Sequence, residues 1–249
     1  MNGGWAFPRW IAHRGAGKLA PENTLAAFRL GARYGYRAFE CDVKLSADGV
    51  PFLLHDATLE RTTNGQGIAG DRNWAELSQL DAGSWHSRLY AGESIPSLKA
   101  VAAFVQHNGF ALDLEIKPTP GLDAHTGAVV AREVARLWHG RAQVPLLSSF
   151  QPQALRAAFD SEPALPRALL LDSLPAAAID MALELRCVAL ITHHKIMDAA
   201  LVMRIHSAGM RAMVYTVNEA ERARQLLACS IDGLVTDAVD RFSPCSDPA

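Results

Sequence analysis

Residues 37–56 read RAFECDVKLSADGVPFLLHD. The arrangement of apolar and acidic residues in this stretch is the starting point for inferring the fold. The first half has the apolar residues of a strand, but two of its central positions are the carboxylates Glu40 and Asp42. Residues two apart in a strand point to the same face, about 6.5–7 Å apart along it. The chain then turns and returns through an extended segment, 50–54, to His55. Because two acids and a histidine are costly in a buried strand, we expect this strand to end in a solvent-filled functional cleft.

Outward from this stretch, short strand-like runs alternate with Ala- and Leu-rich amphipathic stretches almost to the end of the chain. This alternation favours a parallel sheet with helices outside it. The expected strands are 10–13, 37–43, 110–116, 144–148, 166–170, 188–192, 211–217 and 231–236. The expected helices are 24–34, 98–107, 124–139, 152–159, 175–185, 198–207 and 219–227. Eight strands in 249 residues predict an α/β fold, a closed (β/α)₈ TIM barrel. An open doubly wound sheet, which normally has fewer strands, is the alternative.

The segment 56–96 interrupts this alternation with glycines, asparagines and two tryptophans in short helical patches. It is too long for an ordinary loop between a strand and a helix. We therefore expect a small insertion after the second strand. No linker or low-complexity tract is visible elsewhere, so residues 1–249 are expected to form a single barrel domain.

The composition excludes several classes of function. Apolar residues make up 49% and charged residues 20% of the chain, as in ordinary globular proteins. The formal charge of −2 gives no general attraction for nucleic acid or an anionic membrane. The four cysteines, Cys41, Cys187, Cys229 and Cys245, have no CxxC spacing, so neither structural zinc nor a disulfide framework is expected.

Targeting signals are also missing from the sequence. The amino terminus lacks the pattern of a signal peptide. No apolar run approaches the roughly 18–20 residues that span a bilayer. We therefore expect a soluble cytoplasmic protein without a membrane anchor, and its oligomeric state is left open.

Polar side chains gather at the carboxyl ends of the expected strands, where (β/α)₈ barrels form their active sites. His13 and Arg14 follow the first strand, and Glu115 and Lys117 lie at the end of the third. The opposite strand ends contribute little beyond Arg and Gly. Later strand ends carry Ser148 and Ser149, His193 and His194, Thr216 with Asn218, and Thr236 with Asp237. This polarity predicts one active site at the carboxyl-end face.

Glu40, Asp42 and Glu115 would bring three carboxylates together from adjacent strands. Such a cluster is strongly repulsive when nothing balances its charge. A hard divalent cation, Mg²⁺ or Ca²⁺, relieves the repulsion, because all-oxygen ligands suit these ions better than zinc. The alternative is a purely structural network in which the acids pair with Arg14 and Lys117. Histidines beside the cluster favour the metal site.

His13 and His55 flank the three acids and are the candidates for general acid and base, since imidazole exchanges protons near neutral pH. Arg14 and Lys117 carry the positive charge that would hold a phosphate.

Two further strand positions have expected orientations. Asp113 shares the strand face of Glu115 and should lie deeper in the barrel as a support residue. Cys41, between the two acids, should face away from them into the outer packing.

Several pieces of the sequence match a known family in order and over nearly the whole chain. They are IAHRGAGKLAPENTLAAF, FECDVKLSADGVPFLLHDATLERTTNGQG, AGESIPSLKAV, LDLEIKP, SSF, VYTVN and DGLVTDAVD. The combination of HRG, PENT, E-x-D, HD and E-x-K is highly specific. In these motifs the chain resembles the glycerophosphodiester phosphodiesterase family.

The resemblance implies a (β/α)₈ barrel with the inserted segment, one divalent cation, and hydrolysis of glycerophosphodiesters to sn-glycerol 3-phosphate and an alcohol. By position, it implies that Glu40, Asp42 and Glu115 hold the metal. It also implies that His13 and His55 form the acid/base pair.

The phosphate would be held by Arg14 and Lys117 on the same resemblance. The family often has Trp where this chain has Tyr215, which keeps an aromatic wall and adds a hydroxyl. This change bears on the preferred alcohol more than on catalysis.

Two alternative functions are considered. A related barrel phosphodiesterase acting on lysophospholipids would have an exposed apolar rim near its cleft, whereas a closed polar pocket would favour water-soluble glycerophosphodiesters. A non-catalytic phosphodiester-binding protein would be expected to have lost a histidine or a metal carboxylate, and here all of them are present.

Overall fold

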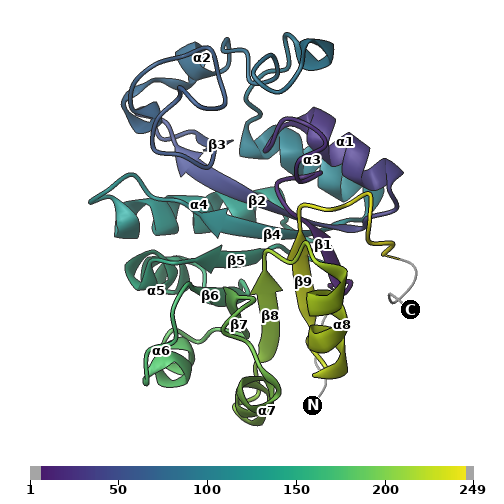
Figure 1. The fold of residues 1–249 in the computed structure, drawn as a ribbon. Helices are drawn as coiled ribbons and strands as arrows, with labels where there is room; N and C mark the ends of the chain where they lie inside the picture. Colours follow the sequence, from purple (N-terminus) through teal and green to yellow (C-terminus); the bar gives the residue numbers. More distant parts are fainter. Residues whose placement is uncertain (1–6, 245–249) are drawn as a thin grey trace.

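Eight parallel strands close into a barrel in the computed structural model, which describes residues 7–244 (Figure 1). Their order is β1-β9-β8-β7-β6-β5-β4-β2, and a pairing between β1 and β2 closes the ring. The strands are β1 (Trp10–Ala12), β2 (Ala38–Leu45), β4 (Ala111–Ile116), β5 (Leu146–Ser149), β6 (Arg167–Leu171), β7 (Ala189–His193), β8 (Arg211–Tyr215) and β9 (Gly233–Thr236). The predicted TIM barrel is confirmed, and the closing pair rules out the open sheet.

A short extra strand, β3 (Pro51–Leu53), pairs antiparallel with β2 and corresponds to the expected return segment. Gly49 has a φ of +79° in the connecting turn, a conformation that favours glycine. The strand β2 runs two residues beyond its expected end at Val43. It continues to Leu45, because β3 supplies hydrogen-bonding partners there.

Helices surround the barrel on its outer side (Figure 1). They are α1 (Leu25–Arg33), α3 (Leu98–Asn108), α4 (Asp123–Leu137), α5 (Pro152–Ser161), α6 (Ala178–Glu184), α7 (Ala199–Ser207) and α8 (Ala220–Ala228). All seven expected helices are present, with bounds that differ by a few residues. The side chain of Thr24 caps α1 by accepting from the backbone N–H of Ala27.

The segment between β3 and α3 folds into short helical turns, η1 (Ala69–Asp71), α2 (Trp74–Leu77) and η2 (Arg88–Tyr90). It lies beyond β2 and β3 at one side of the barrel (Figure 1). It has its own small apolar cluster, formed by Phe52, Leu54, Leu59, Ala69, Leu77, Ala82 and Ile95. That residues 1–249 form a single domain stays a prediction.

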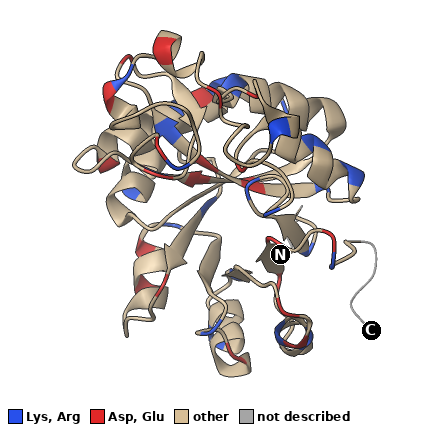
Figure 2. Ribbon diagram, turned by 45° about the horizontal axis from the view of Figure 1, so that its top comes forward, with Lys and Arg blue, Asp and Glu red and all other residues tan. Residues whose placement is uncertain are grey.

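Charged residues are interspersed over the helices and loops, and acidic residues also lie on the central strands (Figure 2). None of the described helices is long and apolar enough to cross a membrane. Cys41, Cys187 and Cys229 are free thiols, and Cys245 lies outside the described residues.

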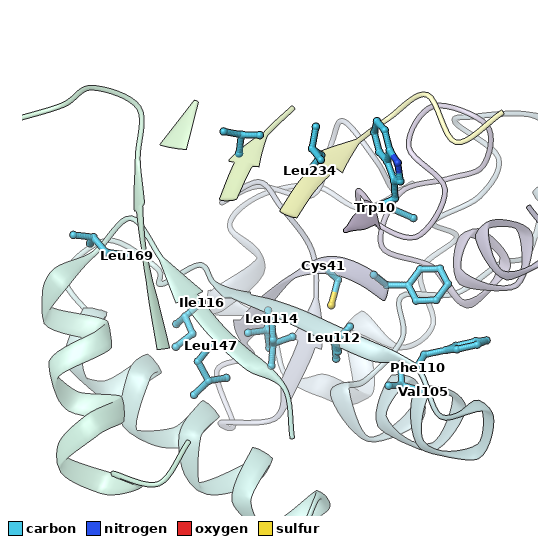
Figure 3. Close-up of a cluster of buried hydrophobic side chains, with 14 of the residues drawn as sticks. Trp10, Cys41, Val105, Phe110, Leu112, Leu114, Ile116, Leu147, Leu169 and Leu234 are labelled. Atoms are coloured by element: carbon cyan, nitrogen blue, oxygen red, sulfur yellow. The ribbon is translucent and has the colours of Figure 1, made fainter. Parts of the chain in front are cut away.

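The apolar core has two layers because side chains alternate between the two faces of each strand. The barrel interior contains mostly small and branched residues, namely Ile11, Ala38, Ala111, Leu146, Ala168, Leu170, Ala189, Ile191, Met213 and Val235. The layer between strands and helices is larger, and Leu112, Leu114 and Leu147 lie in it (Figure 3). Cys41 belongs to this outer layer and is fully buried, as expected from its position between the two acids.

Candidate active site

A pocket of about 220 Å³ contains most of the predicted site residues. Its lining includes His13, Arg14, Glu40, His55, Glu115, Lys117 and Tyr215. Asp42 is the exception, since it lies almost fully buried behind the pocket, in contact with two of the lining cations. The predicted clustering is therefore confirmed, because eight residues that span most of the sequence meet at one place.

The three acids come together through the register of two neighbouring strands. In the pairing of β2 with β4, Asp42 lies opposite Glu115. One carboxylate oxygen each from Glu40, Asp42 and Glu115 lies within 4.8 Å of the others, and all three residues are buried. Only oxygen ligands are offered, which is the donor set that Mg²⁺ and Ca²⁺ prefer.

The charges of the acidic cluster are only partly balanced. Burial raises the pKa of Asp42, but Arg14 and Lys117 outweigh it and lower that pKa to about 2. Their charged nitrogens lie 3.3 and 3.6 Å from the Asp42 oxygens.

Glu40 and Glu115 behave in the opposite way. Burial, and then the charge of Asp42, raises the pKa of each carboxyl. The Nζ of Lys117 lies 2.7 Å from Glu115 Oε1 and lowers the pKa of this carboxyl, but burial and the charge of Asp42 outweigh it. The neighbouring cations therefore outweigh burial at Asp42 and not at the two glutamates. The residues fit a divalent cation.

His13 is anchored through its Nδ1, which donates to Asp237 Oδ1 at 2.6 Å. Asp237 also accepts from the side-chain amide of Asn218 at 3.0 Å. Burial raises the pKa of Asp237, but these two bonds outweigh it and lower the pKa to about 2. The Nε2 of His13 is left toward the acidic cluster, 3.7 Å from Glu40 Oε2.

His55 is anchored in the same way, with Nδ1 donating to Asp56 Oδ1 at 2.7 Å. The guanidinium of Arg61 donates to both oxygens of Asp56, at 2.6 and 3.0 Å. Burial lowers the pKa of His55. The backbone N–H of Leu54 donates to Asp42 O at 3.1 Å, which places His55 beside the acids.

Arg61 also joins the two sides of the site. It donates two 2.8 Å hydrogen bonds to Glu22, and Glu22 accepts a third, also 2.8 Å long, from Arg14. A continuous chain of charge-assisted bonds thus leads from Asp56 to Arg14. Such bonds are stronger than neutral ones, so they hold Arg14 in place, and they hold His55 in place through Asp56.

Sequence reasoning missed Glu22, Arg61 and Asn23. The Asn23 amide donates to Asp42 Oδ2 at 2.8 Å, and Asn23 accepts from the backbone N–H of Asp42 at 3.1 Å. Asn23 precedes the expected helix 24–34, and no role at the site was predicted for it. No local pattern could have paired Arg61 with Glu22, because the two are 39 residues apart.

A buried lysine, Lys44, was also missed. It lies on β2 and donates from Nζ to the backbone carbonyl of Lys117 at 3.2 Å. Burial lowers the pKa of Lys44 to about 8. Its alternation with Glu40 and Asp42 on the strand is the signal that could have placed it on the inner face.

Tyr215 forms an aromatic wall together with Phe150, which the sequence reasoning did not include. The two rings meet edge to face with centroids 5.6 Å apart. Phe150 also lies 5.4 Å from the ammonium of Lys117. Asp113 lies deeper, as expected, where it accepts from Ser148 Oγ at 2.7 Å. Burial raises the pKa of Asp113 to about 7.

The paired histidines at the end of β7 are less central. Among the described residues that line the pocket, neither His193 nor His194 is included. The ring of His193 packs edge to face against Tyr215 with centroids 5.8 Å apart. The ring of His193 therefore lies behind the aromatic wall and does not line the pocket.

This arrangement can bind an anion and exchange protons with it. Arg14 and Lys117 offer positive charge beside an acidic cation-binding cluster. Each histidine has one nitrogen fixed by a carboxylate and the other left for a ligand. Groups of this kind suit the displacement of an oxygen at phosphorus.

Comparison with known proteins agrees with this chemistry. A model of the glycerophosphoryl diester phosphodiesterase family matches residues 13–241. The chain is similar to the glycerophosphodiester phosphodiesterase of Caldanaerobacter subterraneus, with 32% identity over 227 residues that cover 91% of this chain and 93% of the relative.

Solved structures give the same result. A phosphodiesterase from Oleispira antarctica in complex with the product sn-glycerol-3-phosphate has a TM-score of 0.86 and 35% identity, covering 92% of this chain and 93% of that one. A glycerophosphodiester phosphodiesterase from Agrobacterium tumefaciens has a TM-score of 0.81 and 28% identity, covering 95% of this chain and 99% of that one.

Proposed function

Since the chain belongs to the glycerophosphoryl diester phosphodiesterase family, a family of phosphoric diester hydrolases, we propose that it hydrolyses water-soluble glycerophosphodiesters to sn-glycerol 3-phosphate and an alcohol. One observation carries the proposal. Three buried carboxylates, two cations and two carboxylate-anchored histidines converge on one small pocket.

Glu40, Asp42 and Glu115 would hold one divalent cation, Mg²⁺ or Ca²⁺. Their all-oxygen donor set and the raised pKa values of the two glutamates support this assignment. When bound, the ion supplies positive charge that stabilises the negative charge developing on the phosphate.

Arg14 and Lys117 would hold the phosphate oxygens. Both cations already lie beside Asp42, and their remaining N–H groups are available to a phosphate next to the acidic cluster. Tyr215 would form a wall of the pocket through its ring.

His13 and His55 would exchange the protons of the reaction. One imidazole accepts a proton from the attacking water molecule as the water oxygen bonds to phosphorus. The other donates a proton to the ester oxygen as its bond to phosphorus breaks. Asp237 and Asp56 support this role because each holds the proton on Nδ1 and leaves Nε2 for the substrate.

The pocket favours a water-soluble diester over a lysophospholipid. None of the exposed large apolar side chains in the described part of the chain lines this pocket. Polar and charged groups, including His13, Arg14 and Lys117, line it together with the buried interior residues Leu170 and Ile191. A small pocket with this lining suits a glycerol group, whereas an acyl chain would need an apolar groove.

The proposal is tested by measuring glycerol 3-phosphate release from glycerophosphocholine and glycerophosphoethanolamine. We expect His13→Ala and His55→Ala each to lower kcat by about 10²–10⁴-fold. His125→Ala, an exposed substitution on α4, is the matched control and should leave turnover unchanged. EDTA should abolish activity and added Mg²⁺ or Ca²⁺ should restore it. Full turnover in either site variant, or in metal-stripped enzyme, would refute the corresponding role.

A further inference from the structure

A second cavity, of about 320 Å³, adjoins the catalytic pocket and shares His13 and Arg14 with it. It lies between the loop that follows β1 and the segment between β3 and α3. Beyond the shared residues and Asp237, it is lined by Gly17, Lys18, Ala20, Glu22, Arg61, Trp85 and His86. A phosphate held at Arg14 would therefore have one cavity on either side for its two ester groups.

The wall formed by Trp85 is fixed within the protein. The indole Nε1 donates to Ala82 O at 2.9 Å, while the ring remains 40% exposed. The neighbouring His86 donates from Nε2 to Lys18 O at 3.0 Å, which ties this segment to the loop after β1. Asp81 adds rigidity by accepting from the backbone N–H groups of Gly83, Ser84 and Gly92 at 2.7–2.8 Å.

The charges in this cavity are predominantly positive. Glu22 is already bound by Arg14 and Arg61, and Asp237 is bound by His13. Lys18 is near enough to lower the pKa of Asp237, but no described carboxylate forms an ion pair with its ammonium. A ligand in this cavity would meet an uncompensated lysine and an exposed indole face.

The two cavities differ in how they are formed. The catalytic pocket is closed below by rigid barrel strands, which suits the glycerol group common to all glycerophosphodiesters. The second cavity is formed by loop segments and has exposed side chains, Lys18 and Trp85, among its lining residues. Loops are the parts of a fold that usually set specificity.

We propose that this second cavity binds the leaving alcohol and prefers a polyol over a quaternary ammonium group, an inference that rests on the proposed hydrolysis. The indole face would pack against the C–H groups of a polyol. Lys18 and Arg61 would donate hydrogen bonds to its hydroxyls. A trimethylammonium group accepts no hydrogen bond, and the uncompensated charge of Lys18 would oppose the cation–π attraction of the indole for it.

The test compares kcat/KM for three substrates: glycerophosphoglycerol, glycerophosphocholine and the methyl ester of glycerol 3-phosphate, whose leaving group is too small to reach the cavity. The wild type should prefer the polyol substrate to the choline substrate. Lys18→Glu should shift that ratio toward choline by about tenfold, which corresponds to about 1.4 kcal/mol. Lys99→Glu makes the same charge change on α3, outside the cavity, and should leave the ratio unchanged.

Trp85→Ala should raise KM for the polyol substrate several-fold while kcat on the methyl ester stays at the wild-type value. Trp85→Phe retains a ring and should recover most of the loss. Leu89→Ala, a truncation of a fully exposed side chain in the same segment, is the control. If the enzyme cleaves the methyl ester, a substrate ratio that changes in neither Lys18→Glu nor Trp85→Ala would overturn the inference, as would a wild-type preference for the choline substrate. Failure of the wild type to cleave even the methyl ester would instead refute the proposed hydrolysis.

Discussion

The two histidines differ in what holds the carboxylate behind each ring. Asp56, behind His55, is clamped by the guanidinium of Arg61. Asp237, behind His13, is bound by the neutral amide of Asn218. A cationic guanidinium therefore holds the carboxylate behind His55, whereas a neutral amide holds the carboxylate behind His13.

This difference leads to a prediction for Asp237→Asn. The amide can donate to Nδ1 of His13 instead of accepting from it, which would place the ring proton on the wrong nitrogen. We expect kcat to fall by about 10²-fold with little change in KM. The pH dependence of kcat should also change, because the charge beside His13 is lost.

Steady-state kinetics between pH 5 and 9 would check this result, with a thermal melt to confirm folding. Asp160→Asn, an exposed acid on α5, is the control. A variant that keeps wild-type kcat and the wild-type pH profile would show that Asp237 does not position His13.

Single residues could be predicted from the sequence where their chemistry is unusual for a strand. Glu40, Asp42 and Glu115 stood out because carboxylates are rare on buried strands. Asn23 and Arg14 owe their positions to left-handed backbone, with φ of +58° and +49°. Such conformations are uncommon outside glycine and depend on surrounding contacts, so a sequence pattern does not reveal them.

At the scale of elements, the close approach of α4 and α5 depends on one glycine. A Cβ added to Gly127 on α4 would lie 2.1 Å from the backbone carbonyl oxygen of Ala154 on α5. Backbone atoms cannot move aside as a flexible side chain can. The two helices would have to separate and lose part of their buried contact.

We therefore expect Gly127→Ala to lower the free energy of unfolding by about 1–3 kcal/mol, although alanine favours helix formation. Chemical denaturation of the purified enzyme would measure the change. His125→Ala, two residues away on an exposed face of α4, should have almost no effect. Unchanged stability of Gly127→Ala would mean that the helices can separate without cost.

Strands and helices were predictable because their periodicity is local, whereas their ends were less so. The strand β2 extends past the expected end, since β3 supplies backbone partners that only the folded hairpin provides. The helix α1 begins one residue later than expected, because Thr24 caps it while the side chain of Asn23 binds Asp42. In both cases a contact between elements decided a local boundary.

At the scale of the whole molecule, the barrel could be predicted from the eightfold alternation of strands and helices in the sequence. The second cavity could not be predicted, because it is formed where two loops meet. The contact between His86 and Lys18 spans 68 residues, and no sequence period marks it. A cavity formed where loops meet is therefore the feature that the sequence predicts least well.

The acidic cluster also affects the stability of the entire fold. In metal-free protein, burial and the charge of Asp42 raise the pKa of Glu40 and raise the pKa of Glu115 to about 8. The unfolded value for glutamate is about 4.3. A carboxyl whose pKa is raised on folding does not destabilise the folded protein at pH values below its unfolded pKa. Stability is lost as the pH rises from the unfolded pKa through the folded pKa. The pKa of Asp42 is lowered to about 2, so Asp42 has the opposite effect on stability. That effect changes with pH only below about pH 4.

We therefore predict that the melting temperature of metal-free protein falls between about pH 5 and pH 8, whereas protein with Mg²⁺ or Ca²⁺ stays nearly constant. A cation at 100 times its Kd stabilises the folded state by about 2.7 kcal/mol, roughly 5–10 °C for a chain of this size. Calorimetry at both pH values, with EDTA or with each metal, would measure the difference. Glu115→Gln should reduce both the pH dependence and the metal effect. Identical melting temperatures with and without metal at pH 8 would contradict a cation site in the acidic cluster, because the repulsion that the ion should relieve would then have no measurable cost.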